Sequence, residues 1–64
     1  MTADEYADAV LQKVGLPLNG GSKEERLLRD LYLPGIRGSM SAGRSVDDAA
    51  KIFEAHAKLR GYPK

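Results

Sequence analysis

The chain has 64 residues, a formal net charge of +1 and no cysteine. Its length allows one domain over residues 1–64 with a small core, because a chain of about 60 residues buries only about 60% of its unfolded surface. The absence of cysteine excludes disulfides and thiolate metal sites and is typical of a cytoplasmic protein. The acidic N-terminus and the lack of an apolar run of about 20 residues predict neither a signal peptide nor contact with a membrane.

Three segments start with the same helix signal, a hydroxyl residue followed three positions later by an acid. The pairs are Thr2 with Glu5, Ser22 with Glu25, and Ser45 with Asp48. A glycine, an apolar residue and a proline at 15–17 and again at 61–63 are typical of a helix end. We therefore expect an all-α fold, a small bundle of three main helices over about 3–14, 23–32 and 46–60.

The apolar spacing predicts which side of each helix faces the core. In the second helix, Leu27, Leu28 and Leu31 are expected to point inward, and Pro34 is expected to end the helix near residue 32. In the third helix, Phe53 lies in the middle of the apolar face and is expected at the centre of the core.

The connection from Leu33 to Ser45 is long for a small helical domain, in which such connections have about 2–8 residues. A short fourth helix over about 34–41 would place Leu33, Ile36 and Met40 on one apolar stripe and end at Gly43. It would also create a side of small residues, made of Gly35, Gly38, Ser39 and Ala42. Two internal glycines weaken a helix by about 1 kcal/mol each, so an irregular ordered loop is the equal alternative.

The sequence contains few residues that could carry catalytic chemistry or bind a metal. One histidine and no cysteine cannot build a zinc site of three or four nitrogen and sulfur ligands. His56 lies on an apolar helix face, which favours a partly buried structural histidine. The paired acids at helix starts are explained by the helix dipole, and no serine has the setting of a hydrolase nucleophile. We expect no enzyme, no metal and no cofactor.

A binding role is predicted for the 33–45 connection, because glycine, serine and arginine leave backbone donors and positive charge together. Methionine, arginine and an exposed isoleucine are residue types that interfaces favour. The candidate partner-binding residues are Ile36, Arg37, Met40 and Arg44. The simpler interpretation is that the arginines are only the solvent-exposed side of the connection.

Two functions follow from these residues. The first is a small protein-binding module, an adaptor or inhibitor, which contacts another protein or a second copy of itself through 33–45 and the adjoining helix ends. Small helical proteins of this kind are common among phage and mobile-element regulators. The alternative is a nucleic-acid-binding domain of helix-turn-helix type, with phosphate contacts from Arg37, Arg44, Lys51, Lys58 and Arg60. The acids Asp47 and Asp48 at the start of the third helix and the long connection before it count against this alternative.

Overall fold

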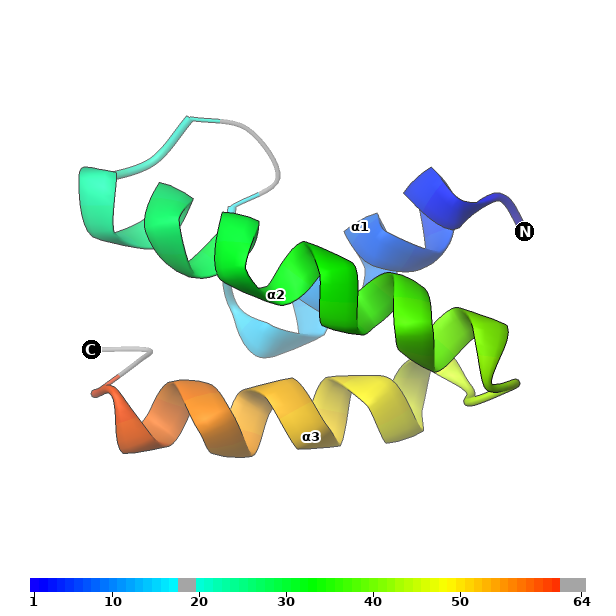
Figure 1. Ribbon diagram of the computed structural model, residues 1–64. Helices are drawn as coiled ribbons and strands as arrows, with labels where there is room; N and C mark the ends of the chain where they lie inside the picture. The colour runs from blue at the N-terminus through cyan, green and yellow to red at the C-terminus, as the bar shows by residue number, and fades with distance from the viewer. Residues whose placement is uncertain (18–19, 62–64) are drawn as a thin grey trace.

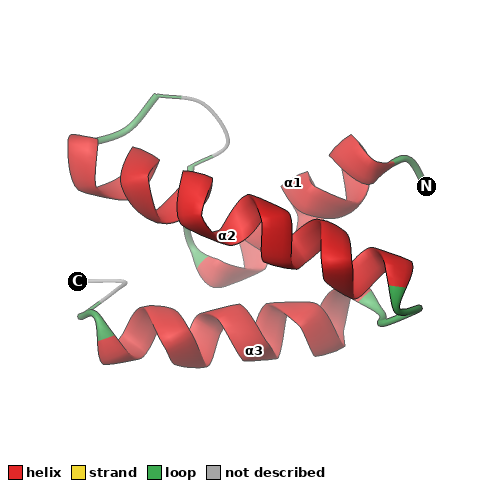
Figure 2. Cartoon of the chain, in the orientation of Figure 1, coloured by secondary structure: helices red, strands yellow, loops and turns green. Residues whose placement is uncertain are grey.

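A computed structural model describes residues 1–17 and 20–61 of the chain. In these residues the chain forms three helices and no strand: α1 (Ala3–Val14), α2 (Lys23–Ser41) and α3 (Val46–Leu59) (Figures 1 and 2). The all-α fold is therefore confirmed. The α2 and α3 helices run in opposite directions from their shared turn and diverge toward the other end, while α1 crosses behind α2 (Figure 1).

All three predicted helix starts are confirmed. The Thr2 hydroxyl accepts a hydrogen bond from the Glu5 backbone at 3.1 Å, and the Glu5 carboxylate accepts one from the Thr2 backbone at 3.0 Å. These bonds hold the pKa of Glu5 below its ordinary value. Ser22 and Glu25 form the same reciprocal pair. At Ser45 the hydroxyl accepts from the Asp48 backbone at 3.1 Å.

The predicted end of the second helix is wrong, because α2 continues through Pro34 to Ser41. There is consequently no separate helix over 34–41 in the described structure; those residues are the second half of α2. Proline removes one backbone hydrogen bond, but the stripe of Leu33, Ile36 and Met40 packs on the core and offsets this loss. Tertiary burial thus overrides the local preference of the X-Pro sequence.

The predicted glycine terminators are found where the structure describes them. Gly43 has a left-handed backbone (φ +77°), and the Arg44 backbone donates to the Ser39 carbonyl, which closes α2. After α1, the Leu16 backbone donates to the Leu11 carbonyl at 3.0 Å, and Leu16 is buried. Leu18, Tyr62 and Pro63, which also belong to predicted turns, lie outside the described residues.

The core lies where α1 packs on α3, which share the most extensive contact, while α2 and α3 touch each other least. Its most deeply buried large side chains are Val10 and Ile36. The small side chains of Ala49, Ala50 and Ala57 are buried and let α3 pack closely against α1. A surface ion pair between Lys13 and Asp47 (2.9 Å) joins α1 to α3, and its hydrogen bond holds the pKa of Asp47 below the ordinary value.

Two predictions about the core are wrong. Phe53 is half-buried, since it packs in the gap between α2 and α3 beside Tyr32, with ring centroids 5.3 Å apart. Leu27 and Leu31 are exposed, and only Leu28 of the three predicted leucines is buried. The inward face of α2 instead carries Leu28, Tyr32, Ile36 and Ser39.

The small-residue side of α2 has two different environments. A Cβ at Gly35 would lie 3.0 Å from the Phe53 ring, whereas a Cβ at Gly38 would have no atom within 4 Å. Since alanine is the better helix former, we expect Gly38→Ala to stabilise the protein by about 1 kcal/mol. Gly35→Ala should gain less or lose stability, because Phe53 must move. Thermal melts of both variants test this difference, and equal gains would contradict the packing of Phe53 against Gly35.

None of the described helices is both long and apolar enough to cross a membrane.

Candidate functional site

The structure separates the four residues predicted to bind a partner. Ile36 is 0% exposed, so the expectation of an exposed isoleucine is wrong: the residue belongs to the core stripe of α2. Met40 is half-buried and packs on the same core. Arg37 and Arg44 are exposed. Only the two arginines thus keep the full accessibility that the prediction required.

Arg44 lies in the tight turn between α2 and α3, and that turn is fastened to α1. The Tyr6 hydroxyl donates a hydrogen bond to the Arg44 carbonyl at 2.9 Å and approaches the Ser45 carbonyl at 3.4 Å. The ring of Tyr6 is buried. The backbone of the turn is therefore held by the core, while the Arg44 side chain projects from an ordered position.

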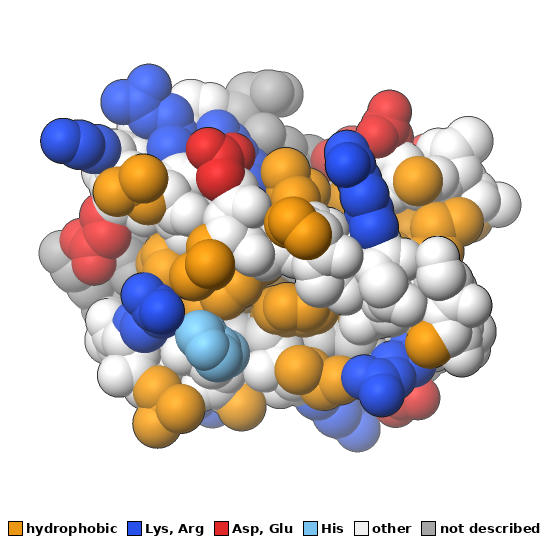
Figure 3. All heavy atoms as spheres, viewed as in Figure 1, with side chains coloured by type: hydrophobic (Ala, Val, Ile, Leu, Met, Phe, Trp, Pro, Cys, Tyr) orange, Lys and Arg blue, Asp and Glu red, His pale blue; other side chains and the backbone are white. Residues whose placement is uncertain are grey.

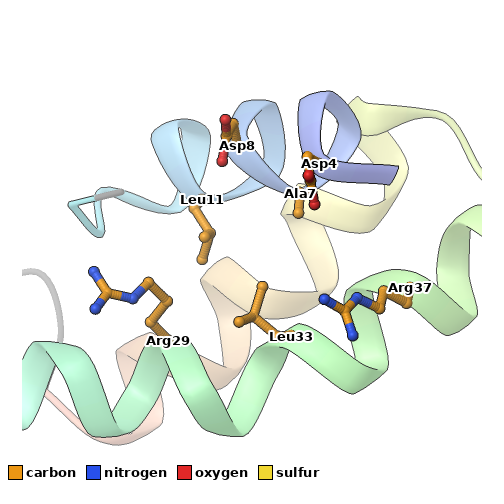
Figure 4. Close-up of a pocket in the computed structure, with 7 residues that line it drawn as sticks. All are labelled: Asp4, Ala7, Asp8, Leu11, Arg29, Leu33 and Arg37. Carbon is orange, nitrogen blue, oxygen red and sulfur yellow. The ribbon is translucent and has the colours of Figure 1, made fainter. Parts of the chain in front are cut away.

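Arg37 lines a shallow cleft between α1 and α2 (Figure 4). Leu11 and Leu33 point into this cleft from opposite helices, and its lining also includes acidic side chains of α1 and basic side chains of α2. The charged residues are Asp4, Asp8, Arg29 and Arg37. Arg29 is engaged, because its guanidinium donates to the Pro17 carbonyl at 3.0 Å. The cleft thus mixes both signs of charge and selects neither an anion nor a cation.

The most distinctive surface lies between α2 and α3. Three large aliphatic side chains line it and are exposed: Leu27 (60%), Leu31 (53%) and Ile52 (45%). Leu59 (87%), which precedes Arg60 on α3, is exposed as well. We call these four residues the α2/α3 face. Figure 3 shows hydrophobic side chains over both helices, on either side of the single histidine. Scattered exposed leucines are ordinary, but a group on adjoining helices is a candidate contact surface.

The floor of this surface is formed by aromatic rings. Tyr32 and Phe53 pack together, and the His56 ring meets Tyr32 edge-on, with centroids 5.4 Å apart. The Tyr32 hydroxyl is hydrogen-bonded to His56 Nδ1 at 3.1 Å. Burial raises the pKa of Tyr32, opposed by the nearby charge of Arg60. The hydroxyl therefore stays protonated near neutral pH, and the floor carries no negative charge.

Two hollows adjoin along the α2/α3 face and share residues. One is lined by Leu31, Tyr32, Ile52, Phe53, His56 and Arg60. The other is lined by Glu24, Leu27, Leu28, Leu31 and Arg60. Because Leu31 and Arg60 belong to both, the hollows form one continuous groove. Its walls are mainly apolar, and its charged groups lie near one end.

Sequence reasoning missed this groove because it placed Leu27 and Leu31 in the core. A signal was present, because α2 carries more large apolar residues than one face of a helix can bury: Leu27, Leu28, Leu31, Tyr32, Leu33, Ile36 and Met40. Periodicity alone does not tell which of them stay outside. His56, predicted to be a structural histidine, is exposed at this groove.

The described residues contain no group of three or more histidine, cysteine, aspartate or glutamate side chains placed to hold a metal ion. Comparison of the chain with protein-family models, with curated proteins and with solved structures found no match.

Proposed function

We propose that this chain is a small, non-enzymatic protein-binding module of the cytoplasm, an adaptor or inhibitor that contacts another protein chain through the α2/α3 face. The observation that carries the proposal is the exposure of Leu27, Leu31 and Ile52 around one apolar groove, together with the exposure of Leu59 next to Arg60 on α3. Arg37 and Arg44, which the sequence predicts as partner-binding residues, are exposed and available for further contacts.

The energetics of burial support a protein as the ligand. Fully burying a leucine or isoleucine side chain is worth about 1.5–3 kcal/mol, and this small domain leaves four of them partly in water. Burial of this apolar surface would offset part of the entropic cost of association. A nucleic acid or a small polar ligand offers little apolar surface with which to cover the leucines.

Site-specific photo-crosslinking in cells tests this proposal. A benzophenone amino acid at position 27 is expected to give covalent adducts with protein, because Leu27 is exposed in the free chain and covered in the complex. The matched control is position 12, since Gln12 is exposed on α1. Adducts at neither position, or equally strong adducts at both, would contradict a protein contact at the α2/α3 face.

One observation favours the nucleic-acid alternative, and another counts against it. The α2–α3 connection spans only residues 42–45, the length of the turn in a helix-turn-helix motif. The basic residues, however, line different surfaces: Arg37 the α1/α2 cleft, Lys51 a hollow with Asp47, and Arg60 the α2/α3 groove. Lys58 is paired with Glu54 at 3.2 Å.

A salt series separates the two functions. Binding to duplex DNA through phosphate contacts weakens steeply as the salt concentration rises, whereas burial of the leucines is insensitive to salt or strengthened by it. We expect no binding to duplex DNA even at low salt. Salt-dependent binding that Arg44→Glu weakens would instead support the nucleic-acid alternative.

A further inference from the structure

We infer that the partner protein covers the α2/α3 face with an amphipathic α-helix, which places apolar side chains in the groove and an acidic side chain beside Arg60. The inference rests on the proposed function, since it names the kind of segment that covers the same surface. It is carried by two properties of the groove. Its walls offer no backbone hydrogen bonds to a bound chain, and the hollow over the aromatic rings is lined by a base and by no acid.

The walls of the groove decide the backbone conformation of the segment that can lie in it. In the interiors of α2 and α3, backbone groups are bonded within their own helix. The described residues also contain no strand whose edge could pair with an extended chain. An extended segment in this groove would therefore bury backbone groups without partners, which is unfavourable. A helix satisfies these groups within itself, so the groove favours helix-in-groove recognition.

The two hollows set the spacing of the anchoring side chains. Along α2, one hollow lies beside Leu27 and Leu28 and the other beside Leu31 and Tyr32. These two positions are four residues apart, about 6 Å along a helix. Side chains at i and i+4 lie at the same spacing on one face of a helix. A helix that follows α2 can therefore place one large apolar side chain in each hollow.

The divergence of α2 and α3 leaves room for such a helix. The two helices touch each other least of the three pairs and move apart away from their shared turn (Figure 1). The aromatic rings of Tyr32 and Phe53 close the bottom of the gap. A helix seated above these rings would contact both α2 and α3.

The charge of the groove selects an acidic helix. The hollow over the aromatic rings contains Arg60 and His56 and no acid. Arg60 takes part in none of the ion pairs found among the described residues. Glu24 lines only the other hollow and already has an interaction within the chain. A carboxylate of the partner can therefore bind the Arg60 guanidinium in a strong charge-assisted pair, whereas a lysine at that place would face a like charge.

Selection of peptides on the purified chain tests the inference. The probe is a phage-displayed library of random peptides of about 16 residues, roughly four helical turns. On the wild-type chain we expect enrichment of large apolar residues at i and i+4 together with aspartate or glutamate. On Arg60→Glu we expect the acids to disappear and lysine or arginine to be enriched instead. A groove that binds through apolar contact alone would give the same peptides on both chains.

Binding of one selected peptide, measured by fluorescence anisotropy, tests its place and its conformation. Leu31→Glu and Ile52→Glu are each expected to weaken binding at least tenfold. Both residues are exposed, so circular dichroism should show unchanged helix content. Gln12→Glu introduces the same charge on α1 and should leave binding unchanged. A proline in the middle of the peptide should also weaken binding at least tenfold, because it breaks a helix.

Several results would overturn the inference. They are the failure to select any peptide, selected peptides that tolerate the central proline, and an acid preference that Arg60→Glu leaves unchanged. A purified chain that dimerises through Leu31 and Ile52 would also overturn it, because a second copy would then occupy the groove. If position 27 cross-links to protein in cells and the selected peptides are neither helical nor acidic, the helix is wrong and the proposed function stands.

Discussion

Replacement of Ile36 by alanine is expected to lower the free energy of unfolding by about 2–5 kcal/mol. Ile36 is 0% exposed and lies on the core face of α2, so truncation leaves a cavity among α1, α2 and α3. A domain of this size has little stability to spare. Urea unfolding followed by circular dichroism should therefore show a largely unfolded chain or a transition at much lower denaturant.

The graded control is Ile36→Val, which removes one methylene and should cost about 0.5–1.5 kcal/mol. Phe53→Ala is a second comparison, because Phe53 is half-buried and should cost less than its position at the centre of the apolar pattern predicts. If Phe53→Ala proves more damaging than Ile36→Ala, the assignment of the core to Ile36 is wrong.

Replacement of Pro34 by alanine is expected to have the opposite sign. Proline inside a helix costs about 3 kcal/mol relative to alanine, and Pro34 is exposed in the interior of α2. Alanine restores a backbone donor toward the Asp30 carbonyl. Alanine also gives the unfolded chain more conformational freedom, which reduces this gain in stability by about 0.4–1 kcal/mol. We expect a net stabilisation of about 1–2 kcal/mol, measured as a higher urea midpoint.

Arg26→Ala, at an exposed position of the same helix, is the control for Pro34→Ala and should change stability by less than about 0.5 kcal/mol. A loss of stability in Pro34→Ala would mean that α2 needs the backbone geometry that proline imposes in order to follow the core.

Local chemistry made part of this fold predictable. The hydroxyl caps at Thr2, Ser22 and Ser45 act through neighbouring backbone groups, so each helix start could be located from four residues. Gly43 could be recognised as a terminator for the same reason, because only the backbone of its own turn is involved.

What could not be predicted depends on tertiary packing. Whether a helix stops at Pro34 is decided by the burial of Ile36 and Met40 beyond it, and that burial requires α1 and α3 to be in place. The same holds for the choice between Leu27 and Tyr32 as the inward residue of α2. The predicted binding surface differs from the observed candidate site for the same reason, because Leu27 and Leu31, which are predicted to lie in the core, are exposed.

The most direct measurement of the central claim uses the absence of cysteine from the chain. Single cysteines introduced as Leu27→Cys and Gln12→Cys provide one thiol on the α2/α3 face and one on α1. Their maleimide labelling rates are compared in cells expressing the chain and in the denatured protein. We expect Leu27→Cys to be protected at least tenfold relative to Gln12→Cys. Equal labelling rates at the two positions in cells would contradict the claim that the α2/α3 face is covered by a protein.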